Sequence, residues 1–213
     1  MEKPVIIFGA QGLGIVALDI LQQNDVVVYG FLDDDEALQG KEINHVPVLG
    51  STQAENYLEL LGKDCEACIA LANRGKQERL LAMLKKQKEL IPINAIHPSA
   101  IVAATALFGY GNLMHANVVV GPNATLGNNC FLQAQAVVAH KVVVKDFVQI
   151  GAGSVIGENA MLNEGVFVGA GATIVAGVEI GTEASIGAGS VVVAHVKPGE
   201  TVLGNPAKPV KLK

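Results

Sequence analysis

Proton transfer and metal binding are the two kinds of chemistry that the histidines of this sequence would support. The sequence contains five of them, His45, His97, His115, His140 and His195. Imidazole titrates near neutral pH, so a histidine beside a reacting group acts well as a general base. His97 and His115 share a regular spacing of eighteen residues. A catalytic zinc site needs a third protein ligand with them, however, and we predict no metal site.

Cys65 and Cys68 form a CxxC pair, a spacing used by zinc sites and by redox sites. Zinc would need a second pair of ligands nearby, and the sequence offers none. We therefore interpret Cys68 as part of a buried strand and Cys65 as lying just before it. Three cysteines are too few for a disulfide framework, which fits a reducing cytoplasm.

A glycine-rich segment, Gly9 to Gly14, directly follows the apolar run Val5–Phe8. Such a turn between a strand and a helix brings backbone amides to a phosphate, although a tight turn alone also explains the glycines. Asp33 and Asp34 follow a second apolar run, where a ribose or base contact is expected unless they form a solvated turn. Asn73 follows a third run. The candidate substrate-binding residues are Gln11, Gly12, Leu13, Asp33, Asp34 and Asn73.

The elements that would position these residues alternate between strand-like and helix-like patterns. Val26 to Leu32 and Cys68 to Leu71 indicate further strands, while residues 52–61 and 76–88 carry helical patterns. Strands and helices joined by short links are typical of a parallel sheet flanked by helices. We predict a small α/β Rossmann-like domain over residues 1–90.

The remainder of the chain repeats every six residues. Counted in sixes from Ile96 to Pro198, all eighteen residues are apolar, and the residue four places after each is usually small or β-branched. The one clear polar exception in that second column is Asn112. Three places after each apolar residue, ten of eighteen are Gly or Asn, which tolerate positive φ and therefore favour corners. Three such sides make a triangular coil of eighteen residues. The pattern predicts an all-β parallel β-helix of hexapeptide repeats, with about six coils, over residues 91–203.

Several motifs together resemble the bacterial hexapeptide-repeat sugar acyltransferases, of the sialic-acid O-acetyltransferase and UDP-4-amino-sugar N-acetyltransferase type. They are the glycine loop, Phe31-Leu32-Asp33-Asp34, His97-Pro98-Ser99-Ala100, the hexad run, and Gly204-Asn205-Pro206-Ala207-Lys208 in a tail over residues 204–213. The resemblance implies a left-handed β-helix, a homotrimer with active sites between neighbouring helices, and acetyl-CoA as acyl donor. It also implies that the amino-terminal domain holds a sugar nucleotide and that the acceptor is such a sugar or a sialic acid.

The resemblance further implies roles for individual residues. His140 corresponds to the family's general base. The acetyl-CoA contacts would come from residues along the later coils and the tail: Gln149, Gly169, Ala170, Gly187, Ala188, Asn205 and Lys208. Four positions depart from the family pattern. Lys141 replaces the acid that follows the base, Gln149 replaces a second histidine, Gln133 replaces an asparagine, and Leu13 replaces the histidine of the glycine loop.

One acidic residue can replace the missing partner of His140. With eighteen residues to a coil, Glu158 stacks directly on His140, about 4.8 Å along the helix axis. A carboxylate there would orient the imidazole, as Asp does in a catalytic triad. The alternative is that Glu158 is a solvent-facing charge without a partner. We predict His140 and Glu158 as the catalytic pair and Cys130, in the column of small residues, as a core residue.

Composition excludes other classes of function. The net charge is −5, without a long basic run, which argues against a nucleic acid as partner. No apolar stretch is long enough to span a membrane, and no secretory signal is evident, so a cytoplasmic location is expected. The leading hypothesis is an acetyltransferase. The alternative is a catalytically silent member that binds a sugar nucleotide or acts as an assembly partner.

Overall fold

The computed structural model describes residues 3–88 and 90–210, which form two compact units, Met1–Pro98 and Ser99–Lys213. The division falls eight residues after the predicted end of the first domain. Residues 1, 2, 89 and 211–213, which belong to the predicted first domain and tail, lie outside the described residues. No helix among the described residues is both long and apolar enough to cross a bilayer.

The first unit is built on a mainly parallel sheet with the strand order β3-β4-β2-β1-β5. The strands are β1 (Val5–Phe8), β2 (Val28–Leu32), β3 (Glu42–Ile43), β4 (Val46–Gly50) and β5 (Glu66–Ile69). The helices are α1 (Leu13–Gln23), α2 (Glu55–Leu58) and α3 (Arg74–Lys88), and a short strand, β6 (Ala95–Ile96), follows them. β1 is apolar throughout and is buried on both faces, as expected of a central parallel strand.

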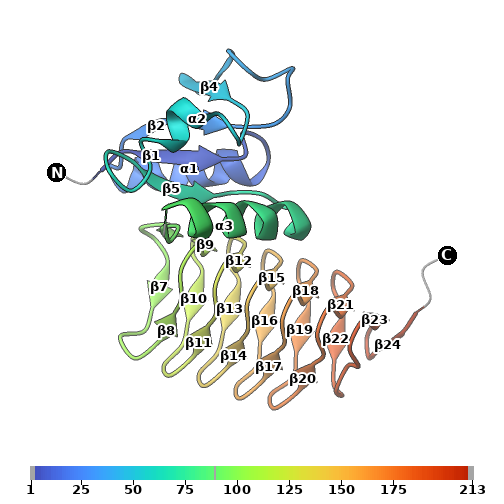
Figure 1. Ribbon diagram of the computed structural model, residues 1–213. Helices are drawn as coiled ribbons and strands as arrows, with labels where there is room; N and C mark the ends of the chain where they lie inside the picture. Colours follow the sequence, from blue (N-terminus) through green and yellow to red (C-terminus); the bar gives the residue numbers. More distant parts are fainter. Residues whose placement is uncertain (1–2, 89, 211–213) are drawn as a thin grey trace. The chain divides into compact units, whose positions relative to one another are not determined.

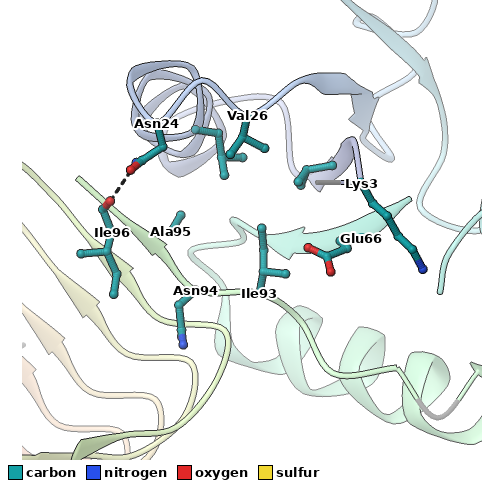
Figure 2. Close-up of a pocket in the computed structure, with 10 residues that line it drawn as sticks. Lys3, Asn24, Val26, Glu66, Ile93, Asn94, Ala95 and Ile96 are labelled. Atoms are coloured by element: carbon teal, nitrogen blue, oxygen red, sulfur yellow. Dashed lines mark hydrogen bonds between the residues drawn. The ribbon is translucent and has the colours of Figure 1, made fainter. Parts of the chain in front are cut away.

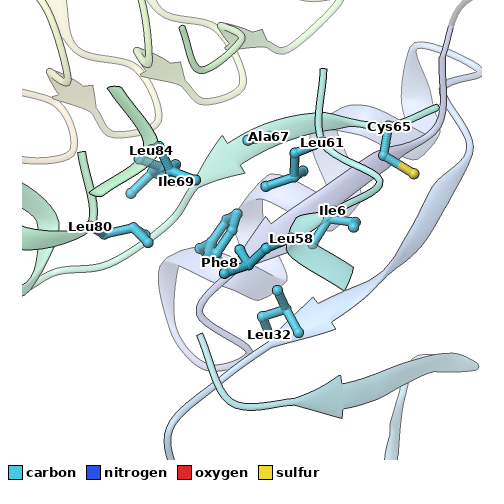
Figure 3. Packing of buried hydrophobic residues seen from close by; sticks show 10 residues of the cluster. All are labelled: Ile6, Phe8, Leu32, Leu58, Leu61, Cys65, Ala67, Ile69, Leu80 and Leu84. Atoms are coloured by element: carbon cyan, nitrogen blue, oxygen red, sulfur yellow. The ribbon is translucent and has the colours of Figure 1, made fainter. Parts of the chain in front are cut away.

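The predicted strands and helices of this unit are present with shifted ends. The helical pattern over residues 52–61 yields only the single turn α2. The β3–β4 hairpin was not predicted. It turns on Asn44 and His45, both with positive φ, as a two-residue turn between twisted strands requires. One side of the sheet packs on α3, where Phe8, Leu32 and Ile69 meet Leu80 and Leu84 in a buried cluster (Figure 3).

The second unit is a parallel β-helix of two-residue strands that recur every six residues (Figure 1). Successive strands belong to three different sheets in turn. Sheet E contains β7 (Ile101–Val102), β10 (Val119–Val120), β13 (Val137–Val138), β16 (Val155–Ile156), β19 (Thr173–Ile174) and β22 (Val191–Val192). Sheet F contains β8 (Leu107–Phe108), β11 (Thr125–Leu126), β14 (Val143–Val144), β17 (Met161–Leu162) and β20 (Glu179–Ile180). Sheet D includes β9 (Leu113–Met114), β12 (Phe131–Leu132), β15 (Gln149–Ile150), β18 (Phe167–Val168), β21 (Ser185–Ile186), β23 (Thr201–Gly204) and β24 (Ala207–Pro209).

The hexad pattern specifies the interior of this β-helix. Every sixth residue from Met114 to Val192 is buried, and so is the second column of small residues. The corner residue of each hexad from Gly111 to Gly189 has positive φ. Gln135, Lys141, Phe147 and Glu183 adopt this conformation although they are neither Gly nor Asn. The coil geometry therefore overrides the local preference of single residues.

The apolar column departs from the prediction at both ends. Phe108 is 39% exposed, in one of the first coils. Pro198, the last residue of the predicted column, is exposed because the final coil is two residues shorter. Ile180 there faces Val196 and Ile186 pairs with Val202, at a separation of sixteen residues instead of eighteen.

Asn112, the polar exception in the second column, is fully buried and joins two coils. Its Oδ1 accepts a hydrogen bond from the Cys130 amide at 2.8 Å, and its Nδ2 donates to the Gly127 carbonyl at 3.0 Å. Without Asn112 the buried Cys130 amide would lose this acceptor, whereas the Gly127 carbonyl also accepts from the Gly109 amide at 3.2 Å. The side chain therefore takes the place of a missing backbone contact between coils.

We expect Asn112→Ala to lower the free energy of unfolding by about 1–3 kcal/mol, since it removes the acceptor of the buried Cys130 amide. Urea denaturation measures the change. Thr182→Ala, at an exposed corner, is the control and should lie near wild type. Equal stability of the two variants would contradict the assigned role of Asn112.

Candidate active site

His140 and Glu158 contact each other from neighbouring coils. His140 follows β13, and Glu158 follows β16, the next strand of the same sheet. The imidazole Nε2 lies 3.2 Å from Glu158 Oε2, with 46% and 52% of the two side chains exposed. The Asn159 amide donates to the His140 carbonyl at 3.2 Å, which ties the two corners together. Of the two alternatives for Glu158, the structure therefore has the carboxylate next to the imidazole. What this contact does in catalysis stays a prediction.

Glycine on the coil below leaves room for His140. A Cβ at Gly121 would lie 2.8 Å from the His140 amide nitrogen and 3.2 Å from its Cα. Any side chain there would push the histidine backbone outward. Lys141, the residue after the histidine, occupies the corner with φ of 56°. The Lys141 amide donates to the Pro122 carbonyl at 3.0 Å, so this corner is held by the coil below.

The predicted acetyl-CoA residues lie along a different edge of the β-helix. His140 and Glu158 are at the corners between sheet E and sheet F. Gln149 lies on β15 in sheet D, and Gly169-Ala170 and Gly187-Ala188 are at the corners between sheet D and sheet E. A single chain therefore does not bring the two predicted groups together, because sheet E lies between their edges.

The glycines of the D–E edge have a packing role of their own. A Cβ at Gly169 would lie 2.6 Å from the Ala188 nitrogen, and one at Gly151 would lie 2.5 Å from the Ala170 nitrogen. At Gly187, a Cβ would meet the side chain of Leu203. Stacking of coils thus requires glycine at these positions without any ligand. The exposed alanines, Ala170 and Ala188, line the outside of the same edge.

The predicted tail forms a hairpin at the end of sheet D. β24 pairs antiparallel with β23, with Lys208 opposite Leu203. Asn205 lies in the turn between the two strands, and both Asn205 and Lys208 are exposed. The tail therefore belongs to the same sheet as Gln149 and extends the row of predicted acetyl-CoA residues.

The glycine loop and the acidic residues of the first unit are joined by hydrogen bonds. Asp33 Oδ2 accepts from the Ala10 amide at 2.7 Å, and Gln11 Nε2 donates to Asp35 at 3.2 Å. Gly14 is required here, because a Cβ at that position would clash with the Gly9 carbonyl. Gly12 and Leu13 begin the turn into α1, and Gly12 has positive φ. The glycines thus shape a tight strand-to-helix turn.

A pocket of about 520 Å³, which we name the α3 pocket, lies beside these acidic residues. It is lined by Asp33, Asp34, Thr52, Gln53, Leu71, Lys76, Arg79, Leu80 and Met83. Of the predicted substrate residues, it includes Asp33 and Asp34. Asn73 instead caps α3, since its Oδ1 accepts from the Lys76 amide at 2.9 Å. Lys76 and Arg79 were missed by the sequence analysis. Their i, i+3 spacing on a helix was the available signal.

A second cavity of about 460 Å³ lies at the opposite ends of the strands, lined by Lys3, Asn24, Glu66 and Asn94 among others (Figure 2). The Asn24 side chain already has partners there, because its Nδ2 donates to the carbonyls of Ile20 and Ile96.

The cysteines do not offer a nucleophile. Burial raises the pKa values of the Cys68 and Cys130 thiols to about 12, so both are protonated at neutral pH. Among residues 3–88 and 90–210, no three His, Cys, Asp or Glu side chains are grouped as metal ligands.

Two sequence families match parts of the chain. Residues 4–84 match the PglD N-terminal domain, and residues 159–194 match the bacterial transferase hexapeptide repeats. No curated protein sequence matches the chain.

Solved structures match over almost the whole length. The acetyltransferase domain of PglB from Neisseria gonorrhoeae, in complex with acetyl coenzyme A, is 28% identical with a TM-score of 0.90, covering 99% of this chain and 100% of that one. A histidine-to-alanine mutant of GDP-perosamine N-acetyltransferase from Caulobacter crescentus, in complex with CoA and GDP-perosamine, is 25% identical. Its TM-score is 0.90, and the match covers 99% and 98% of the two chains. WeeI from Acinetobacter baumannii shares the fold, at 24% identity and a TM-score of 0.74, over 97% and 99% of the chains.

These matches agree with the two-unit order, the hexapeptide coils and the motifs of the sequence. They confirm the predicted resemblance to the hexapeptide-repeat sugar acyltransferases.

Proposed function

We propose that the protein transfers an acetyl group from acetyl-CoA to an amino or hydroxyl group of a sugar, either linked to a nucleotide or of the sialic-acid type. The acetyl-CoA, CoA and GDP-perosamine complexes of its structural relatives support this donor and class of acceptor. The observation that carries the proposal for this chain is the contact between His140 and Glu158.

The contact supports Nδ1 as the nitrogen of the imidazole that takes the proton. Glu158 Oε2 lies next to Nε2, so a neutral ring donates its Nε2–H to the carboxylate. Nδ1 then keeps a free electron pair and is the base that accepts a proton from the acceptor amine or hydroxyl. Glu158 acts as a positioning residue, because it holds the tautomer and stabilises the imidazolium.

The reaction needs no acyl-enzyme. The acceptor nitrogen or oxygen attacks the thioester carbonyl carbon while His140 takes its proton. Backbone amides stabilise the oxyanion of the tetrahedral intermediate. The carbon–sulfur bond then breaks, and the departing CoA sulfur receives the proton from the imidazolium. The products are the acetylated sugar and free CoA.

A catalytically silent protein that binds a sugar nucleotide is the second candidate. The departures from the family pattern at Lys141, Gln149, Gln133 and Leu13 favour it. Gln133 has a role in the scaffold, since its Oε1 accepts from the Ala152 amide at 3.2 Å. Substrate contacts that the family makes through these positions would then be lost while the fold remained intact.

A thiol-release assay distinguishes the two candidates. The protein is mixed with acetyl-CoA and, in turn, UDP-linked and GDP-linked amino sugars and sialic acid. Release of CoA that requires both the protein and one acceptor supports the acetyltransferase. Binding of a sugar nucleotide without CoA release from any acceptor favours the silent protein.

A homotrimer would complete the site. The outward residues of sheet E are all apolar or β-branched: Ile101, Val119, Val137, Val155, Thr173 and Val191. Such a continuous face favours burial against another copy. Association through sheet E would bring the E–F edge of one chain, with His140, near the D–E edge of a neighbour. The predicted acetyl-CoA residues of one chain and His140 of its neighbour would then line one groove.

Lys208 is expected to contact a phosphate of CoA. We expect Lys208→Gln to raise the KM for acetyl-CoA about three- to fivefold, since an exposed ion pair contributes up to about 1 kcal/mol. The ratio of the variant KM to the wild-type KM is then measured with acetyl-dephospho-CoA, which lacks the 3′-phosphate. This comparison tests whether Lys208 contacts that phosphate. Lys197→Gln, another exposed lysine near the end of the β-helix, is the control. An unchanged KM in Lys208→Gln would remove this residue from the site.

A further inference from the structure

The α3 pocket has walls of opposite charge. Asp33 and Asp34 follow β2, while Lys76 and Arg79 come from α3. Residues 76, 79, 80 and 83 recur at helical spacing and form one face of α3. Leu80 is buried in the core, which fixes the orientation of this face (Figure 3). Two cations from α3 and two carboxylates that follow β2 therefore line the same pocket.

The two cations have donors available to a ligand. Arg79 Nε donates to the Gly75 carbonyl at 3.0 Å, which orients the guanidinium, and Arg79 is an exposed residue. Lys76 is exposed as well. A phosphate or diphosphate group is the anion that such a pair binds well.

The glycine loop is poorly suited to the same anion. Asp33 already accepts from the Ala10 amide, and the Gly9 and Gly14 amides donate to the carbonyls of Leu32 and Gln11 at 2.8 Å. A phosphate bound by the Ala10 amide would have to replace the Asp33 carboxylate as its acceptor. Three of the six amides of this turn, those of Gly9, Ala10 and Gly14, are therefore already used within the protein.

The acidic wall suits the other end of a nucleotide. The Thr52 amide and hydroxyl both donate to Asp34 Oδ1, at 2.9 and 2.8 Å. These bonds fix the carboxylate and leave Oδ2 to accept from a ribose hydroxyl or a base N–H. A molecule with a diphosphate at one end and hydroxyl or N–H donors at the other matches both walls.

We propose that Lys76 and Arg79 hold the diphosphate of a sugar nucleotide in the α3 pocket, and that the Gly9–Gly14 loop does not bind it. This assignment rests on the proposed function for the identity of the ligand class. It makes Lys76 and Arg79 specificity-determining residues that select nucleoside diphosphates over nucleosides.

Calorimetric titration of the full chain with UDP, GDP, uridine and guanosine tests the proposal. Wild type should bind at least one diphosphate more tightly than its nucleoside. Lys76→Gln and Arg79→Gln should each weaken diphosphate binding about tenfold and leave nucleoside binding unchanged, because each removes a charge-assisted contact to phosphate. Lys85→Gln is the matched control. Lys85 lies nine residues after Lys76 on α3, half a turn around the helix, and should bind as wild type.

Three outcomes would overturn the assignment. They are diphosphate binding by the Lys76→Gln/Arg79→Gln double variant as tight as in wild type, equal weakening in Lys85→Gln, and absence of diphosphate binding in wild type. Thiol release separates these outcomes from failure of the proposed function. A double variant with unchanged KM for an active sugar nucleotide contradicts only the phosphate site. A wild-type protein that releases no CoA with any acceptor contradicts the acetyltransferase, whatever the titrations show.

Discussion

Replacing His140 with alanine is expected to lower kcat for acetyl transfer by about 10²- to 10⁴-fold, the usual contribution of a general base. The KM values should change little, because the imidazole acts on the proton that moves in the transition state and not on substrate binding. Steady-state thiol release with the best acceptor measures both constants.

Substitution of Glu158 provides a second test of this catalytic pair. Glu158→Gln should lower kcat about tenfold or more, again with little change in KM, because the amide no longer stabilises the imidazolium. The double variant should lose little beyond His140→Ala alone, since Glu158 acts only through the imidazole at 3.2 Å. Glu183→Gln, at an exposed corner between sheets F and D, is the control.

The outcomes of this cycle separate the two residues. If Glu158→Gln keeps full turnover while His140→Ala is inactive, the carboxylate has no positioning role. If both variants keep full turnover, His140 is not the base. Additive losses in the double variant would mean that Glu158 acts independently of the histidine.

Replacing Val155 with aspartate is expected to dissociate the proposed trimer and to lower activity about 100-fold or more. Val155 lies outward on sheet E and is 39% exposed in the single chain. Three carboxylates buried in a trimer interface would lack partners, which strongly opposes association. Activity should fall with assembly, because a lone chain keeps His140 and the D–E edge apart.

Sedimentation velocity at micromolar concentration measures the assembly. Wild type should sediment at about three times the 22.1 kDa chain mass and Val155→Asp as the monomer. Leu107→Asp is the control, since Leu107 is 68% exposed on sheet F, whose outward column already includes Glu179. A wild-type monomer, or a monomeric Val155→Asp with full activity, would contradict the shared site.

The β-helix is the part of the protein that the sequence alone determined most completely. Each coil is specified by local rules: an apolar residue every sixth place, a small residue in the second column, and a corner that accepts positive φ. Because the six-residue sides follow one another without an insertion and three sides make a coil, the pattern predicts a coil length of eighteen residues. This length places Glu158 on His140 without knowledge of any contact. The contact at 3.2 Å is the direct product of that periodicity.

Only the tertiary structure decided the features that break the repeat or depend on distant side chains. The final coil is two residues shorter although Pro198 continues the apolar column, and Ile186 pairs with Val202 instead of a residue eighteen places on. The predicted acetyl-CoA residues and His140 are separated by sheet E, which a list of positions along the chain does not reveal. Asp33 closes onto the glycine loop, and Lys76 and Arg79 reach the α3 pocket, through contacts between segments far apart in sequence. Side chains that choose partners across such separations follow no period, so their positions become known only when the chain is folded.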